Sequence, residues 1–377
     1  MSLEQMQNVV FDLLRRMVEK KASDLFLTAG FPPAIKLDGK MTPLTSKPLS
    51  AAQTQDIAKV VMNDKQYAEF EQNNEYNFTI EVPGNLRFRV NAFVQRSAVG
   101  LVFRTISKVP DFKSLGLPTI LKDLALEKRG LLIFVGASGA GKSTSLAAMV
   151  DHRNEHTRGH IVSIEDPIEF VHEHKNCIVT QREIGVDTES WSVALKNSLR
   201  QAPDVILIGE IRDRETMDYA IAFAETGHLC MATLHANSTN QALDRIVNFF
   251  PEERRQQLLL DLSLNIRAFV SQRLIPNKDG KGRVAAVELM LNSPFISELI
   301  LRGAVHEIKE AIAKSRPMGM QTFDQAVFDL HEAGLISYEE AIRNADSAND
   351  VRLKIKLDSK INKAPDAGND LQGLGMI

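Results

Sequence analysis

The apolar run Leu131-Leu132-Ile133-Phe134-Val135 leads directly into Gly136-Ala137-Ser138-Gly139-Ala140-Gly141-Lys142-Ser143-Thr144, and this stretch decides the fold. Five consecutive apolar residues are typical of a parallel strand that is buried on both faces. The next nine match the pattern G-x-x-x-x-G-K-[ST], and residues 144–150 have the composition of a helix start. A strand, a glycine-rich loop and a helix in this order predict a phosphate-binding loop in an α/β sheet.

Each residue type in this loop suits an anion. The glycines allow left-handed backbone angles, so that successive N–H groups can point at phosphate oxygens. Lys142 would add charge for the β- and γ-phosphates, and the hydroxyl of Ser143 would bind Mg²⁺. The alternative is a glycine-rich turn with an exposed lysine, which leaves the flanking strand and helix unexplained. The expected ATP contacts are Gly136, Ser138, Gly139, Ala140, Gly141, Lys142, Ser143 and Thr144.

Composition places the chain among ordinary globular proteins and excludes several classes of function. The chain has 377 residues, 44% of them hydrophobic and 25% charged, a net charge of −3 and a pI of about 6.3. A small negative net charge gives no attraction to nucleic acid or to an anionic membrane. The two cysteines cannot form a disulfide framework, which favours a cytoplasmic setting. No stretch approaches the roughly twenty apolar residues of a membrane span, so we expect membrane association only through partners.

Residues 1–110 predict an α+β domain with no catalytic cluster of its own. Apolar residues at helical spacing open the chain, and residues 50–72 predict one or two further helices. Short strands are expected near residues 25–27 and 35–41, the second with an Asp38-Gly39 hairpin tip, and longer ones at 76–80, 86–95 and 100–106. Prolines and a glycine in residues 109–118 mark a connector to the next domain.

One strand of this first domain carries a stripe of polar side chains. The strand period places Arg87, Arg89 and Asn91 on one face of residues 86–95. One interpretation is a solvated face on which the arginines pair with surface acids. The other is that the arginines reach a nucleotide held by a neighbouring subunit, since guanidinium groups suit phosphate charge.

From residue 119 to about 275, apolar strands alternate with helices, which predicts a mainly parallel sheet. After the loop strand, the expected strands are 160–164, 205–209 and 229–234. They are followed by the acidic run Glu165-Asp166-Pro167-Ile168-Glu169, by Glu210 and by His235. Ligands of open α/β sheets bind at the carboxyl ends of the strands. These polar groups should therefore emerge at the same edge as the phosphate loop.

The carboxylates suit the two tasks of phosphoryl transfer, which are holding a metal and activating water. Glu210 follows an apolar strand and a glycine, in the Walker B position for Mg²⁺. Glu165, Asp166 or Glu169 could act as the base for the attacking water. Any one of them alone could be a helix cap or a surface charge. Their joint occurrence at strand ends favours the catalytic interpretation.

Two histidines bracket the strand 229–234. No third ligand at zinc spacing accompanies His228 and His235, which argues against a zinc site. Close to the γ-phosphate they could detect it by hydrogen bonding. The alternative is a purely structural role in the core.

The C-terminal part shows mostly helical periodicity. Residues 251–345 have this pattern, including the leucine-rich run from Leu258 to Ile266, with one more strand expected at 284–290. We expect residues 276–345 to form a mainly helical subdomain. Residues 346–377, rich in Asp, Asn, Lys and Gly, predict a flexible tail.

The four motifs together resemble those of the secretion ATPases of the type II and type IV pilus class. They are Gly136–Thr144, the acidic box 164–169, Gly209-Glu210-Ile211-Arg212-Asp213, and the histidine box from Thr226-Gly227-His228 to Thr233-Leu234-His235. The short N-terminal domain and the absence of a tetracysteine insertion resemble the retraction ATPases of the PilT/PilU family. The resemblance implies a PAS-like first domain, a RecA-like P-loop core and a helical C-terminal part.

The resemblance also implies a function. It is that of a hexameric motor, peripheral at the inner membrane under the pilus platform protein, which hydrolyses ATP for pilus retraction and twitching motility. By position it implies Glu169 as the catalytic base, Glu210 at the magnesium site, and His228 and His235 as phosphate sensors. Arg87 and Arg89 would face the nucleotide of the neighbouring subunit.

One segment departs from the family pattern. PilT proteins carry Ala-Ile-Arg-Asn-Leu in the C-terminal domain, whereas the matching stretch here is Phe295-Ile296-Ser297-Glu298-Leu299, without the arginine. This departure favours the PilU type, an accessory motor that works with a PilT-like paralogue. It also keeps open a nucleotide-binding scaffold with incidental turnover. A nucleic-acid translocase is disfavoured by the acidic balance and by the lack of a basic patch interleaved with aromatic residues.

Overall fold

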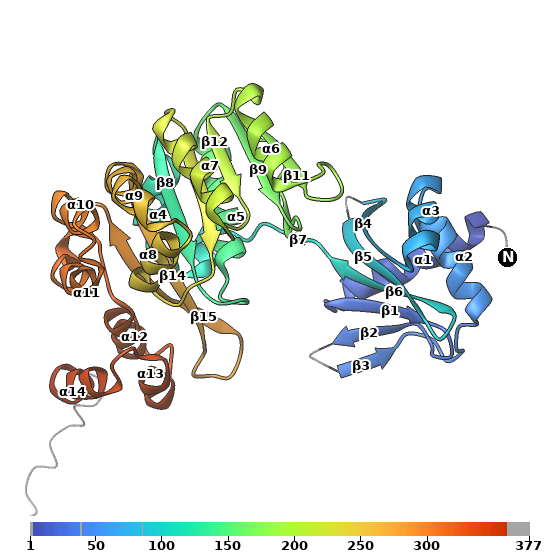
Figure 1. Ribbon diagram of the computed structural model, residues 1–377. Coiled ribbons are helices and arrows are strands. Elements are labelled where there is room, and N and C mark those ends of the chain that lie inside the picture. Colours follow the sequence, from blue (N-terminus) through green and yellow to red (C-terminus); the bar gives the residue numbers. More distant parts are fainter. Residues whose placement is uncertain (1–2, 38–39, 85, 360–377) are drawn as a thin grey trace, which may run out of the picture. The chain divides into compact units, whose positions relative to one another are not determined.

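The computed structural model describes residues 3–37, 40–84 and 86–359. The chain divides into two compact units, Met1–Lys108 and Val109–Ile377 (Figure 1). Among the described residues, no helix combines the length and the apolar character needed to cross a lipid bilayer.

The first unit is an antiparallel sheet with helices packed on one face. The sheet has the strand order β3-β2-β1-β6-β5-β4. Phe88, Val90 and Ala92 alternate along β5 and are buried together with the apolar faces of α1 and α2. The expected hairpin is formed by β2 and β3, and its tip, Asp38-Gly39, lies outside the described residues. The elements are α1 (Leu3–Glu19), β1 (Asp24–Thr28), β2 (Ala34–Leu37), β3 (Lys40–Pro43), α2 (Ala51–Val61), α3 (Asp64–Asn73), β4 (Glu75–Val82), β5 (Leu86–Gln95), β6 (Ala98–Thr105) and β7 (Ser107–Lys108).

The second unit is built on a seven-stranded sheet with the order β11-β9-β12-β13-β8-β14-β15. Every neighbouring pair is parallel except β14 and β15, which are antiparallel. The predicted parallel α/β sheet is therefore confirmed. Its strands are β8 (Gly130–Val135), β9 (His160–Glu165), β11 (Ile178–Glu183), β12 (Val205–Ile208), β13 (Leu229–Leu234), β14 (Ile266–Pro276) and β15 (Arg283–Leu291); the short β10 (Phe170–Val171) lies outside this sheet.

Helices cover both faces of this sheet, which explains the unbroken apolar run of β8. Leu131, Ile133 and Val135 face a core formed with α6 to α11, while Leu132 and Phe134 face a second core formed with α4 and α5. The covering helices are α4 (Ile120–Ala125), α5 (Lys142–His156), α6 (Trp191–Ser198), α7 (Arg214–Glu225), α8 (Thr239–Asn248), α9 (Glu252–Asn265), α10 (Pro294–Leu301) and α11 (Val305–Lys314).

Three further helices pack on the β14/β15 end of the sheet. They are α12 (Phe323–Glu332), α13 (Tyr338–Asn344) and α14 (Ala348–Asp358), and the short 3₁₀ turns are η1 (Phe112–Leu115), η2 (Leu199–Gln201) and η3 (Arg316–Met318). Ile275 of β14 and Ala286 of β15 are buried against these helices. The C-terminal helices thus rest on β14, the neighbour of the phosphate-loop strand β8, and on β15, which follows β14 at the edge of the sheet.

The C-terminal part corrects two expectations. The expected helix through Ile266 stops at Asn265, because the following residues pair with β8 and become β14 within the sheet. The expected tail from residue 346 is wrong for α14, whose N-cap Ser347 accepts a hydrogen bond from the backbone of Asp350. Val351 and Ile355, four residues apart, are each 1% exposed and bury the inner face of α14. Residues 360–377 of the expected tail lie outside the described part of the chain.

Candidate active site

The phosphate loop connects the end of β8 to the start of α5, and β14 packs directly beneath it. Gly141 has a left-handed φ of 88°, and a Cβ there would lie 2.7 Å from Nε2 of Gln272. A Cβ on Gly136 would lie 2.8 Å from the carbonyl oxygen of Gln272. The Gln272 amide is oriented by Ser145, whose Oγ donates to Oε1 over 2.8 Å. The glycines are therefore required both by backbone angle and by the close approach of β14.

The loop borders a cavity of about 460 Å³ at the carboxyl end of the sheet. The cavity is lined by loop residues 138–144 and by Glu165, Asp166, Glu169, Glu210 and His235 from the strand ends. Gly136, the first residue of the loop, is not among the residues that line the cavity. One chain segment supplies the cradle for an anion, and three other segments supply acids and a histidine to the same space.

The amino group of Lys142 lies inside the loop. Its Nζ donates to the carbonyl oxygens of Gly136, over 2.7 Å, and Ala137, over 3.1 Å. The residue is 7% exposed. Burial lowers the pKa of this amine, while the negative charges of Glu210 and Glu169 act in the opposite direction. The cation is therefore held among the groups that would receive a phosphate.

Glu210 follows β12 and contacts the ends of two neighbouring strands. Its Oε1 lies 3.2 Å from Nε2 of His235, which follows β13. Its Oε2 accepts from Nε of Arg212 over 2.7 Å, and Arg212 also pairs with Asp166 at 3.4 Å. Burial and, next, the charge of Lys142 lower the pKa of His235. At neutral pH this histidine is therefore a hydrogen-bonding group rather than a cation.

The two glutamates of the acidic box differ in environment. Glu165 accepts hydrogen bonds from Oγ of Ser163 over 2.7 Å and from Nε2 of Gln181 over 3.2 Å. Burial raises the pKa of Glu165, which its hydrogen bonds oppose. Glu169 is exposed and borders the cavity. These contacts suit Glu165 to holding the acidic segment 165–169 in place, and Glu169 is left accessible to a water molecule.

His228 does not share this site within the chain. It precedes β13, and its backbone oxygen accepts a hydrogen bond from the N–H of Gly130, at the start of β8. The phosphate loop and His235 lie at the other ends of these parallel strands, about 20 Å away at 3.3 Å per residue. The structure does not bring His228 to the phosphate loop of its own chain, because the six-residue strand β13 separates the two histidines, and its role as a phosphate sensor stays a prediction.

Arg87 and Arg89 belong to the first unit. Arg87 forms an ion pair with Glu81 of the adjacent strand at 3.2 Å. Arg89 lies opposite Arg104 of β6 in the sheet register. The pairing of Arg87 agrees with the solvated-face interpretation, and the role of Arg89 toward a nucleotide stays a prediction.

Several cavity residues were not singled out from the sequence. Trp191, Phe170, His172, Leu274 and Arg283 also line the cavity. Arg283 begins β15 directly after a glycine-containing turn. Nothing in their local sequence distinguishes these residues from ordinary core or loop positions, because the sheet order brings them to the site. Gln272 was missed for the same reason.

The family of this chain follows from a comparison with known protein families. The model of the type II/IV secretion system protein family matches residues 2–343. The chain belongs to this family. The matched residues include all the segments that line the cavity.

Within this family the chain is similar to pilus ATPases. It is 59% identical over 349 residues to the type IV pilus ATPase PilU of Pseudomonas aeruginosa, covering 92% of this chain and 91% of that protein. It is 45% identical to the type IV pilus retraction ATPase PilT of the same organism, covering 89% and 98%. The predicted membership of the PilT/PilU family, with greater likeness to PilU, is confirmed.

Two solved structures are similar to this chain over most of its length. The crystal structure of the pilus retraction motor PilT with bound ADP has a TM-score of 0.85 and 39% identity, covering 91% of this chain and 99% of that one. The Legionella pneumophila ATPase DotB has a TM-score of 0.73 and 27% identity, covering 88% and 94%. The predicted fold class, an N-terminal α+β domain followed by a RecA-like core, is confirmed.

Proposed function

We propose that this protein is an ATP-hydrolysing motor of type IV pilus retraction and twitching motility, an accessory motor of the PilU type. One observation carries the proposal. Lys142, Glu169, Glu210 and His235, from four separate segments, line one cavity beside a glycine loop in a member of the pilus ATPase family. A surface turn or a purely structural cluster would not need this convergence.

The residues have distinct roles in hydrolysis. Backbone N–H groups of the loop and the Lys142 ammonium bind the β- and γ-phosphates and offset the charge that develops on them. The carboxylate of Glu169 accepts a proton from the water that attacks the γ-phosphorus. His235 hydrogen-bonds near the γ-phosphate and, through Glu210, links its position to the end of β12. The same loop stabilises the negative charge that develops on the leaving group, ADP.

Mg²⁺ would bind between the loop and β12. Ser143 and Glu210 both border the cavity and offer oxygen donors, which this hard cation prefers. When bound, the ion neutralises charge on the β- and γ-phosphate oxygens. Among the described residues there is no group of three or more His, Cys, Asp or Glu residues that could hold a metal. Phosphate oxygens and water would supply the remaining ligands.

The working form is a homo-hexamer that acts with a PilT-like paralogue and the inner-membrane platform protein. It is cytoplasmic and attaches to the membrane only through these partners. The first-unit arginines Arg87 and Arg89 reach the nucleotide of the next subunit in this arrangement. The proposal draws support from the likeness to PilT and PilU and from the polar face of β5, on which Arg87 is exposed and Arg89 partly exposed.

A second candidate is a nucleotide-binding scaffold with incidental turnover. The segment Phe295–Leu299 favours it, because α10 has Ser297 where PilT proteins have arginine, and the Oγ of Ser297 donates to the backbone of Ser263. The Ser297 side chain is therefore already hydrogen-bonded within this chain.

Twitching motility separates the two candidates. A strain lacking this protein is compared with one carrying Glu169→Gln, which keeps the fold and the loop. A motor predicts that both strains lose the contribution of this protein to twitching. A scaffold predicts that only the deletion does. In vitro, purified Lys142→Ala should lose ATP turnover by about 100-fold or more, and near-normal hydrolysis by this folded variant would refute the site.

A further inference from the structure

The loop that follows His235 is held at two points by neighbouring strands. The backbone oxygen of Asn237 accepts from the guanidinium of Arg273, on β14, over 3.3 Å. The backbone N–H of Thr239, the first residue of α8, donates to Oε1 of Glu288, on β15, over 2.8 Å. Glu288 is 2% exposed, so this contact lies in the interior. His235 therefore begins a short segment that is fixed at its far end.

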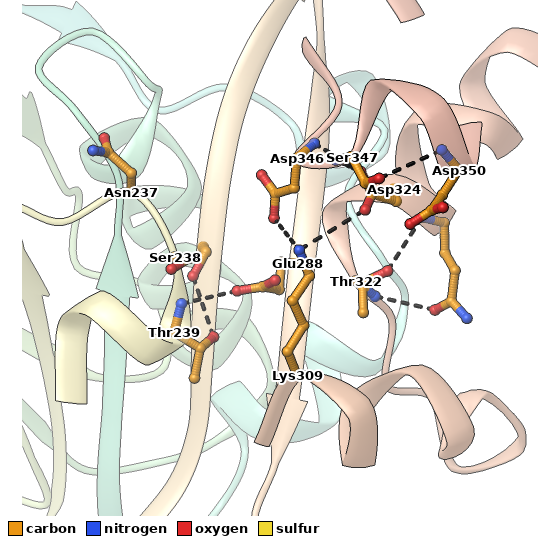
Figure 2. Close-up of polar contacts among 12 residues, drawn as sticks. Asn237, Ser238, Thr239, Glu288, Lys309, Thr322, Asp324, Asp346, Ser347 and Asp350 are labelled. Carbon is orange, nitrogen blue, oxygen red and sulfur yellow. Dashed lines mark hydrogen bonds and ion pairs between the residues drawn. The ribbon is translucent and has the colours of Figure 1, made fainter. Parts of the chain in front are cut away.

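The C-terminal helices supply the charges that hold these two anchors. Asp346, between α13 and α14, accepts from Arg273 over 2.7 Å and from Lys309 of α11 over 2.8 Å. Lys309 also lies 3.8 Å from Asp324 of α12. Figure 2 shows the Lys309 amino group reaching both carboxylates, close to Glu288. Asp346 thus joins Arg273, which holds Asn237, to Lys309, which lies near the acid that holds Thr239.

Asp346 is itself fixed by its surroundings. Its side chain is 18% exposed, and its backbone N–H donates to Oδ1 of Asp324 over 2.7 Å. Arg273 donates in addition to the backbone oxygen of Asn344 over 2.9 Å, and its guanidinium lies 3.9 Å from the ring centroid of Phe323. Neutralising this carboxylate would leave two partly buried cations without their shared partner, which is costly.

The strand that carries Arg273 also supports the phosphate loop. Gln272, the preceding residue of β14, contacts Gly141 and Ser145. Successive side chains of a strand point to opposite faces. One strand therefore contacts the phosphate loop with one residue and the His235 loop with the next.

We propose that Asp346 is a positioning residue for ATP hydrolysis: through Arg273 it ties helices α11 to α14 to the loop 235–239, and so sets His235 against Glu210. The inference rests on the proposed ATPase function. If helices α11 to α14 hold His235 in place, the way they pack on the sheet sets the distance between His235 and the γ-phosphate. A movement of these helices changes the position of His235 without touching the nucleotide.

The test is Asp346→Asn, which keeps the size of the side chain and removes its charge. The matched control is Asp329→Asn, which neutralises an ion pair with Arg316 on the same C-terminal helices, outside this network. Both variants are purified as the full chain, and kcat, KM for MgATP and amide hydrogen exchange are measured. We expect Asp346→Asn to lower kcat by about tenfold with KM changed by less than about threefold, and to exchange faster at 235–239. The control should match the wild type in both readouts.

Two further variants distinguish a specific effect on the loop 235–239 from a general loss of folding. Asp346→Glu keeps the charge and should recover most of the loss in kcat. Lys309→Met, which removes the other partner of Asp346, should reproduce the faster exchange. The inference is overturned if exchange at 235–239 is the same in Asp346→Asn and Asp329→Asn, or if both lower kcat equally. If the wild type itself does not hydrolyse ATP, the proposed function fails, and hydrogen exchange still decides whether Asp346 holds the loop.

Discussion

Nε2 of His235 lies 3.2 Å from Oε1 of Glu210, so the ends of two neighbouring parallel strands are joined at the mouth of the phosphate loop. Each side chain follows its own strand, β13 or β12, and the pairing of these strands brings them together. Arg212 holds the other oxygen of Glu210 and bridges to Asp166. Four groups at three strand ends therefore form one connected polar cluster.

Replacing His235 should impair turnover more than binding. His235→Asn removes the contact with Glu210 while leaving the loop and Lys142 unchanged. We expect kcat to fall by about 100- to 1,000-fold, the range for a lost transition-state hydrogen bond, with little change in nucleotide affinity. His228→Asn is the matched control, because His228 lies at the opposite edge of the sheet. An equal loss of kcat in both variants would mean that His228 acts at a site this chain does not form alone.

The two glutamates of the acidic box should behave differently when each becomes glutamine. Glu169→Gln removes the base, and we expect it to bind ATP while lowering kcat by about 100-fold or more. Glu165→Gln keeps the size of a half-buried side chain whose pKa is raised by burial, so a milder loss is expected. Single-turnover hydrolysis and nucleotide binding distinguish the two. Loss of binding in Glu169→Gln would assign that residue a structural role.

His172 should make stability depend on pH. Burial lowers the pKa of His172 to about 4, from an ordinary value of 6.5. Between these values the unfolded chain binds a proton that the folded protein does not, so stability is full above about pH 6.5 and falls as the pH drops toward 4. Relative to His172→Phe, the wild type should lose up to about 3 kcal/mol over this interval. Urea unfolding at several pH values measures the difference, and parallel curves for the two proteins would contradict it.

Two glycines of the phosphate loop offer a matched pair of alanine substitutions. Both have left-handed φ angles, 78° at Gly139 and 88° at Gly141, but only Gly141 is packed against Gln272. Gly139→Ala should cost about 1–2 kcal/mol, the strain of that backbone conformation. Gly141→Ala adds a clash with β14 and should cost more and abolish nucleotide binding. Thermal unfolding and ATP binding test this, and equal effects would show that the contact with Gln272 does not matter.

Local patterns were enough to predict the elements that carry the site. The run of β8, the glycine loop and the strands ending at Glu165, Glu210 and His235 all follow from apolar runs bounded by polar residues. Prediction failed where an element depends on its neighbours. The segment from Ile266 has apolar residues that suit either a helix or a strand, and its pairing with β8 decides the outcome. The helix α14 was missed because only two of its residues, Val351 and Ile355, are buried deeply.

The sequence by itself determined the phosphate loop, the acidic and histidine segments and the family, because each of these depends on residues that are close together in the chain. Only the tertiary structure decided that His228 lies away from the phosphate loop and that β14 supports this loop through Gln272. It also decided that Asp346 reaches the His235 segment through Arg273. Those relationships join residues far apart in the chain. They are set by strand order and helix packing, which no local pattern contains.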